Sequence, residues 1–104
     1  MYELFCLVSS KIEEKEVTLL GEKIEEIIKN LEGEVSYTKN LGQKKLAYPI
    51  KKEKKSYQLI FYFQLLPQKI KKLEEKLRNF SEILRYQILK IKGTKEIEKG
   101  KNNI

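Results

Sequence analysis

The spacing of the apolar residues changes several times along this chain, and the order of these changes constrains the fold more than any other feature. Four segments are typical of strands, the first as a short run of strand-forming residues and the later ones mainly by their alternation, and two segments repeat apolar side chains at helical spacing. In chain order they are a strand at 2–8, a helix ending near 31, strands at 34–50 and 56–66, a helix at 67–80 and a strand at 83–91.

This order of segments predicts an α+β protein with a ferredoxin-like βαββαβ fold. Right-handed crossovers would place both helices on one face of a four-stranded antiparallel sheet, with the first and third strands as central neighbours. Residues 1–92 would form this domain, and a chain of 104 residues has room for one core. Residues 93–104 are charged and lack periodicity, so we expect a tail that is disordered or becomes ordered on a partner.

Local signals mark the ends of the helices. Ser10 and Glu13 have the spacing of a capping box at the start of the first helix, although the helix could begin several residues later. Gly33 is a natural residue to end that helix, and Pro67 suits the first turn of the second.

The strand at 34–50 changes face in its middle. Val35 and Tyr37 lie at odd positions, whereas the apolar residues of its second half lie at even ones, so we expect a bulge near Gly42. Pro49 cannot donate a ladder hydrogen bond, which places this strand at a sheet edge. The second-half residues, which we expect to face the core, are Leu46, Tyr48 and Ile50.

Charge is divided unevenly along the chain, whose net charge is +7. Residues 1–38 carry four lysines and nine glutamates, a net charge of −5, whereas residues 39–55 carry seven lysines and one glutamate, a net charge of +6. Such polarity favours the approach of a polyanion to one side of the protein. A general abundance of lysine and glutamate, as in heat-adapted proteins, is the alternative explanation.

The alternation also places apolar residues on the sheet face that the helices leave uncovered. The residues expected to face the helices are Leu4, Cys6, Val8, Leu59, Phe61 and Phe63. Their neighbours on the open face would be Phe5, Leu7, Ile60 and Tyr62, joined by Leu89. A contiguous apolar patch of this kind is typical of a protein interface or of a surface on which bases stack. Exposed hydrophobic residues are also ordinary when they occur singly.

The chemistry that the sequence lacks argues against an enzyme. There is no histidine and only one cysteine, so a Cys/His zinc site and a Ser-His-Asp triad are both excluded. The five glycines form no phosphate-binding loop after a strand. We therefore expect no catalytic residue, metal or cofactor. No apolar run approaches the length of a membrane span and no signal peptide is evident, which predicts a soluble cytoplasmic protein.

Residues 42–51, Gly-Gln-Lys-Lys-Leu-Ala-Tyr-Pro-Ile-Lys, resemble the signature block of the bacterial small-subunit ribosomal protein S-six (S6) family. The likeness covers roughly residues 1–92, including Tyr2, Glu3, Pro67, Arg85 and Lys90. It implies a ferredoxin-like fold and a structural role in the small ribosomal subunit. In that role the family pairs with ribosomal protein S-eighteen (S18) as a heterodimer and binds the central domain of the small-subunit ribosomal RNA.

Carried onto this chain, the resemblance implies that Lys44 and Lys45 match the family's basic pair, which would contact RNA phosphate or the partner protein. Lysine lacks the bidentate fork of the arginine often found there, so a phosphate contact is the expected role. The residues expected at the RNA are Lys44, Lys45, Lys51, Lys52, Arg85, Lys90 and Lys92. Those expected at the partner protein are Phe5, Leu7, Ile60, Tyr62 and Leu89.

Three other functions share this topology. A stand-alone RNA-recognition module would use Phe5 and Tyr62, but the glycine and aromatic pattern of its third-strand motif is absent from residues 56–66. An acylphosphatase-like enzyme would need an arginine after the first strand, where residues 8–11 offer none. A small-molecule regulatory domain would predict a homodimer and a melting temperature that depends on ligand.

Overall fold

The computed structural model describes residues 1–91 and confirms the ferredoxin-like α+β fold. The elements are β1 (Tyr2–Ser9), α1 (Glu14–Asn30), β2 (Glu34–Ile50), β3 (Glu53–Gln64), the 3-10 turn η1 (Pro67–Lys69), α2 (Ile70–Leu77) and β4 (Ile83–Lys90). The four strands are antiparallel in the order β2-β3-β1-β4, so β1 and β3 are central. The expected tail at 93–104 lies outside the described residues.

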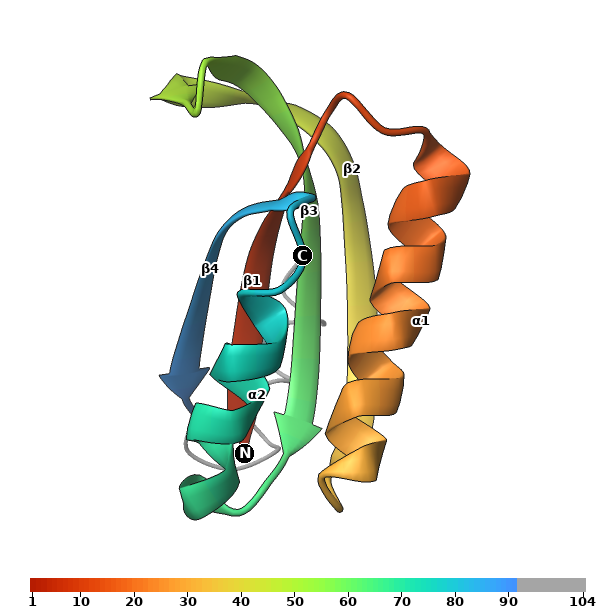
Figure 1. Ribbon diagram of the computed structural model, residues 1–104, viewed down its shortest axis with the longest axis vertical. Helices are drawn as coiled ribbons and strands as arrows, with labels where there is room; N and C mark the ends of the chain where they lie inside the picture. Colours follow the sequence, from red (N-terminus) through yellow and green to blue (C-terminus); the bar gives the residue numbers. More distant parts are fainter. Residues whose placement is uncertain (92–104) are drawn as a thin grey trace, which may run out of the picture.

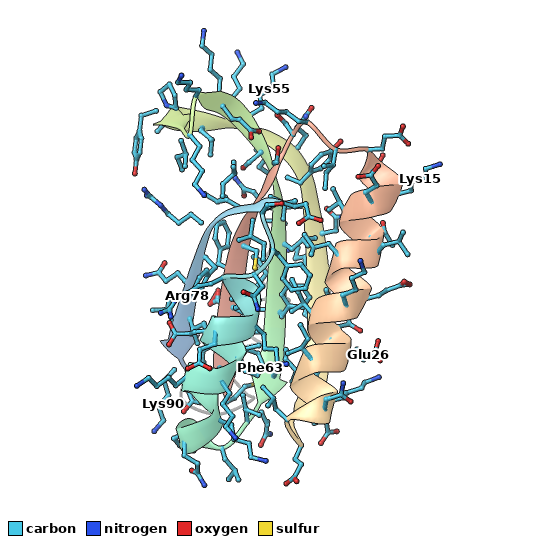
Figure 2. The ribbon with its side chains drawn as sticks, in the orientation of Figure 1. Lys15, Glu26, Lys55, Phe63, Arg78 and Lys90 are labelled. Carbon is cyan, nitrogen blue, oxygen red and sulfur yellow. The ribbon has the colours of Figure 1, made fainter. Side chains whose placement is uncertain are left out.

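Both helices cover the same face of the sheet, and the core lies between the two layers (Figure 1). Phe61 and Phe63 of β3 are fully buried there, and the label of Phe63 marks this layer in Figure 2. Burial also raises the pKa of the Cys6 thiol to about 12, so the thiol behaves as a small apolar group. The other core residues include Leu4, Val8, Val17, Leu20, Ile24, Ile28, Leu59, Leu73 and Leu77. Within the described chain, no helix combines the length and the apolar character that a membrane span requires.

The start of α1 differs from the expected capping box. The N-cap residue is Glu13, and its side chain makes no capping hydrogen bond. Ser10 lies three residues earlier and donates instead to the carboxylate of Glu53, with its backbone N–H 2.9 Å and its hydroxyl 3.2 Å from Oε1. The capping-box prediction was wrong because a buried carboxylate distant in sequence binds the serine.

The end of α1 uses Gly33 for a reason that the sequence pattern did not indicate. Glu32, with φ 67°, takes the left-handed conformation after the helix, and the N–H of Gly33 donates to the carbonyl of Ile28 at 2.9 Å. A Cβ atom at Gly33 would lie 2.7 Å from the carbonyl oxygen of Gln64 and 2.9 Å from Cδ1 of Leu65. The glycine therefore allows the end of α1 to approach the end of β3.

Strand β2 contains more irregularities than the single bulge expected near Gly42. The pairing with β3 shifts there, where Gly42 has φ 77° and its N–H donates to Oδ1 of Asn40 at 2.8 Å. Further shifts occur between Val35 and Tyr37 and beyond Lys45. The edge position of β2 is confirmed. Each shift adds twist, and the far end of the β2–β3 hairpin bends away from α1 toward the side of the sheet where β4 lies (Figure 1).

The expected burial of Tyr48 was wrong. Its side chain is 59% exposed and Leu46 is half-buried, so only Ile50 of the alternating set is buried. The physical reason is length, because this part of the hairpin extends past the layer of helices and finds no core to cover it (Figure 1). The connection between the two strands, expected to span residues 51–55, is also shorter than expected, since β3 already begins at Glu53.

Replacing glycine by alanine at two positions tests the close approach at the end of α1. Gly33→Ala should lower the free energy of unfolding by about 1–3 kcal/mol, because the added methyl group has no space. Gly21→Ala is the control. Its Cβ would meet only Cδ1 of Leu59, at an ordinary 3.8 Å, so the stability should rise by about 0.5–1 kcal/mol. Urea denaturation measures both, and equal effects of the two changes would contradict the assignment.

Candidate nucleic-acid and protein interface

Residues 44–55, which we call the hairpin tip, carry six lysines, and all six are exposed. Lys51 and Lys52 form the two-residue turn between Ile50 and Glu53, with φ 49° and 68°. Both residues are thus in the left-handed conformation of a type I′ turn, which normally favours asparagine and glycine. A side chain in this conformation costs on the order of 1–2 kcal/mol per residue. The lysines at the end of the hairpin are therefore held there at a cost in stability.

The lysines of the hairpin tip repel one another. Lys45 and Lys55 are direct cross-strand partners, and like charges in such a pair are destabilising. The two ion pairs that the structure records within residues 1–91 join Lys15 to Glu13 and Lys69 to Glu32, so neither involves the hairpin tip. The tip thus presents a concentrated positive field to solvent.

Glu53 is the one acidic residue of the hairpin tip, and it points away from the lysines. Its carboxylate is buried and accepts hydrogen bonds from the hydroxyl of Ser9 at 2.8 Å and from the backbone N–H of Ser10 at 2.9 Å. Burial alone would raise the pKa of Glu53, but these hydrogen bonds, together with the charge of Lys11, lower it below the ordinary 4.5. The carboxylate therefore fixes the base of the tip to the end of β1, and as a single negative charge it offsets only one of the six lysines.

A second contact joins the hairpin tip to the opposite edge of the sheet. The Nη1 of Arg85, at the start of β4, donates to the hydroxyl of Tyr48 at 3.2 Å. Because β2 and β4 are the two edge strands, this bond requires the tip to bend across the end of the sheet, as Figure 1 shows. Tyr48 and Arg85 are both exposed, so the bond is a weak one that water and ligands can reach.

The open face of the sheet carries the apolar residues that the alternation predicted. Phe5 and Ile60 are cross-strand partners on the two central strands, and both are half-buried. Leu7 and Tyr62 are half-buried as well, and Leu89 of β4 is 49% exposed. These five residues, which we call the apolar patch, lie on the face away from the helices.

Two features of the apolar patch were missed by sequence reasoning. The ring of Tyr37, from β2, stacks on that of Tyr62 with centroids 5.9 Å apart. Glu3 pairs with both Tyr62 and Leu89, so a carboxylate lies within the patch. Burial raises the pKa of Tyr62, and the charge of Glu3 raises it further. The alternation in the first strand was enough to place Glu3 on this face. The position of Tyr37 could not be predicted, because the bulge between Val35 and Tyr37 changes the face to which it points.

The sequence of this chain was compared with models of known protein families. The family model described as "Ribosomal protein S6" matches residues 1–90, which is nearly all of the described structure. The chain belongs to the ribosomal protein S6 family. This result confirms the resemblance that the block at 42–51 indicated.

Individual members of the S6 family agree with this assignment. The small ribosomal subunit protein bS6 of Dictyoglomus turgidum is 34% identical over 87 residues, covering 84% of this chain and 90% of that protein. Its counterpart in Helicobacter pylori strain Shi470 is 31% identical over 97 residues, covering 93% of this chain and 68% of that protein. The crystal structure of 30S ribosomal protein S6 from Thermotoga maritima superposes with a TM-score of 0.83 at 27% identity, covering 98% of this chain and 94% of that one.

Within this S6 fold, the residues expected at the RNA do not form one surface. Lys44, Lys45, Lys51 and Lys52 are exposed together on the hairpin tip, and Arg85 and Lys51 line the same cleft beside β4. Lys90 is exposed at the other end of β4, far from Lys55 of the tip (Figure 2). Lys92 lies outside the described residues. Arg78, which sequence reasoning did not select, lines the cleft with Lys51 and Arg85.

Replacing Glu53 tests its role as the anchor of the hairpin tip. Glu53→Gln keeps the shape but removes the charge, so the free energy of unfolding at pH 7 should fall by on the order of 1.5–3 kcal/mol, the value of hydrogen bonds to a charged group. Because folding lowers the pKa of Glu53, its contribution is present above about pH 4.5 and disappears as the pH falls through the folded-state pKa. The difference between wild type and variant should therefore shrink at pH 3.

Urea denaturation at pH 7 and pH 3 measures this difference. Glu22→Gln on the exposed side of α1 is the matched control and should have little effect at either pH. A loss from Glu53→Gln that is equally large at both pH values would show that the charge of Glu53 does not contribute.

Proposed function

We propose that this protein is a structural component of the small ribosomal subunit that binds the central domain of the small-subunit ribosomal RNA together with ribosomal protein S18. It acts in the cytoplasm as part of the ribosome, and it needs neither catalysis nor a cofactor. The observation that supports RNA binding most directly is the hairpin tip, where six exposed lysines surround one carboxylate that is buried and hydrogen-bonded away from them.

The geometry of the hairpin tip suits phosphate better than a protein partner. Lysine ammonium groups act as point charges on phosphate oxygens and give affinity that does not depend on base sequence. Lys45 and Lys55 face each other across the strands without a carboxylate between them, so an incoming phosphate relieves their repulsion. The left-handed lysines at the turn cost stability, which is consistent with a binding role at that position.

The apolar patch is the surface on which S18 would bind. Its residues lie on the central strands of the open face, where a partner protein can cover Phe5, Ile60 and Tyr62 together. Interfaces of this kind bury aromatic and aliphatic anchors inside a polar rim. Here Lys39, the β2 partner of Ile60, and Gln87, the β4 partner of Phe5, flank the patch. Strand β3 carries residues of both the hairpin tip and the apolar patch, so a partner that covers the patch can also extend the RNA site.

Replacing the basic pair tests the RNA contact. The double variant Lys44→Ala/Lys45→Ala should leave the melting temperature nearly unchanged, because both side chains are exposed. It should weaken RNA binding and reduce the slope of log K against log salt by about 1.4–1.8, since each phosphate contact contributes about 0.7–0.9. Lys15→Ala/Lys23→Ala on α1 removes the same charge and is the control. Unchanged RNA binding by the first variant would remove the pair from the site.

Titrating the central-domain RNA with this protein, with S18 and with both tests the cooperative arrangement. We expect weak binding by either protein alone and at least tenfold tighter binding by the pair, because the two proteins complete one surface. Ile60→Gln should abolish most of this gain, whereas Leu19→Gln, at a residue 54% exposed on α1, should not. Equal RNA affinity with and without S18 would contradict the pairing and favour a stand-alone RNA-binding module.

A further inference from the structure

A cleft of about 320 Å³ lies at the start of β4, outside the basic pair and outside the apolar patch. Three parts of the chain form it. The hairpin tip contributes Lys51, the end of α2 contributes Arg78, and β4 contributes Arg85. The cleft therefore joins the turn of the hairpin to the opposite edge of the sheet, which is the same junction that the Arg85–Tyr48 hydrogen bond bridges.

The type of basic residue in this cleft is unusual for this protein. Of the 22 basic residues in the sequence, only Arg78 and Arg85 are arginines, and both line the cleft. Arginine binds phosphate oxygens with two parallel N–H donors, whereas lysine offers a point charge. In a chain that uses lysine at all its other basic positions, two arginines in one cleft indicate a ligand that needs directed donors.

The three basic side chains are available to a ligand. Among residues 1–91, neither recorded ion pair includes Lys51, Arg78 or Arg85, and all three are exposed. The residues of the described chain that line the cleft include no acidic one. The carboxylate of Glu74, which precedes Arg78 by one helical turn, accepts a hydrogen bond of 3.4 Å from the hydroxyl of Tyr86 instead. The lining of the cleft is therefore basic, and the Glu74 carboxylate lies beside it on the hydroxyl of Tyr86.

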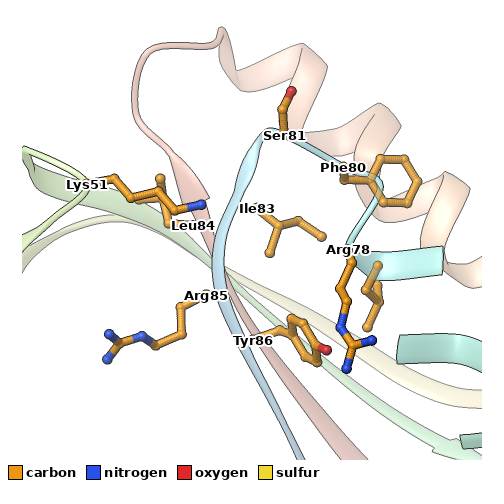
Figure 3. A pocket seen from close by; sticks show the side chains of 9 residues that line it. Lys51, Arg78, Phe80, Ser81, Ile83, Leu84, Arg85 and Tyr86 are labelled. Carbon is orange, nitrogen blue, oxygen red and sulfur yellow. The ribbon is translucent and has the colours of Figure 1, made fainter. Parts of the chain in front are cut away.

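Figure 3 shows how the side chains are arranged around the strand. Lys51 and Arg85 lie on one side of the β4 ribbon, whereas Arg78 lies on the other side with Phe80 and Tyr86. Because β4 is an edge strand of the sheet described for residues 1–91, its outer main-chain N–H groups have no strand partner within that sheet, and such groups are also phosphate donors. A ligand in the cleft would thus cross the outer edge of β4.

We propose that the cleft binds the phosphate backbone of one RNA strand, with one phosphate on Arg78 and a neighbouring phosphate on Arg85 and Lys51. The strand crosses the edge of β4 and continues onto the lysines of the hairpin tip. Binding replaces the exposed Arg85–Tyr48 hydrogen bond by a stronger, charge-assisted one and frees the hydroxyl of Tyr48. This inference rests on the proposed RNA-binding function and adds Arg78, together with a path for the strand, to it.

Substitutions at Arg78 test the proposal in the complex of this protein, S18 and the central-domain RNA. Arg78→Gln should lower affinity about tenfold at low salt, as expected for the loss of a hydrogen bond between charged groups, and reduce the salt slope by about 0.7–0.9. Arg78→Lys should restore the slope but not the full affinity, because it keeps the charge and loses the fork. Lys71→Gln, exposed on the same helix and outside the cleft, removes one charge as a control and should change affinity less than twofold.

A direct readout comes from the two arginine Nε–Hε resonances, which Arg78→Lys assigns because it removes one of them. Addition of RNA to the complex with S18 should shift both resonances. The melting temperature of each variant, measured without RNA, separates folding from binding.

Each other outcome has a definite meaning. If Lys44→Ala/Lys45→Ala weakens RNA binding but Arg78→Gln behaves like Lys71→Gln, the cleft proposal fails and the proposed function stands. If Arg78→Gln weakens the association with S18 in the absence of RNA, the cleft serves a protein and the proposal is wrong. If the wild-type protein does not bind the RNA with S18 present, both the proposed function and the cleft proposal fail.

Discussion

The placement of both helices on one face of the sheet is the constraint from which the other features of this protein follow. The helices bury one set of alternating side chains, including Phe61 and Phe63, and leave the opposite set on an open face. They are also shorter than the β2–β3 hairpin, so the end of the hairpin extends past the core. One packing arrangement thus produces both an uncovered apolar surface and a projecting charged one. A domain with helices on both faces would cover the apolar surface.

The projecting hairpin is held at its base by an electrostatic contact, since hydrophobic burial is limited there. In the second half of β2, Ile50 is the buried apolar residue. Glu53 provides the other contact that holds the hairpin to the domain, through its hydrogen bonds with Ser9 and Ser10. Burying a carboxylate is costly unless hydrogen bonds satisfy it, and here two hydroxyls and a main-chain N–H do so. The same arrangement commits the one carboxylate of the hairpin tip to Ser9 and Ser10, so none of its six lysines has an ion-pair partner among those recorded within residues 1–91. Attachment and electrostatic field therefore depend on one side chain.

Sequence reasoning could predict the order of elements, the edge position of β2 and the apolar patch, because each follows from a period of two or 3.6 in the apolar residues. It could not predict the environment of Ser10 or Tyr48. The capping-box spacing of Ser10 is a local signal, whereas its partner Glu53 is 43 residues away. Tyr48 keeps the alternation of a buried strand beyond the point where the core ends, and periodicity carries no information on where a layer of helices stops. Arg78 is a further case, because its neighbours Lys51 and Arg85 come from other elements.

The opposed pair of Lys45 and Lys55 links the folding of the hairpin to its assembly. In the free protein the repulsion between the two ammonium groups opposes the pairing of the strands that carry them. Under the proposed function, RNA phosphate bound at this pair removes the opposition, so the hairpin would be more stable in the complex than alone. Under the same proposal, a substitution that removes one of these two charges would stabilise the isolated protein and weaken its binding to RNA. The stability of this hairpin and its affinity cannot be optimised independently at that pair.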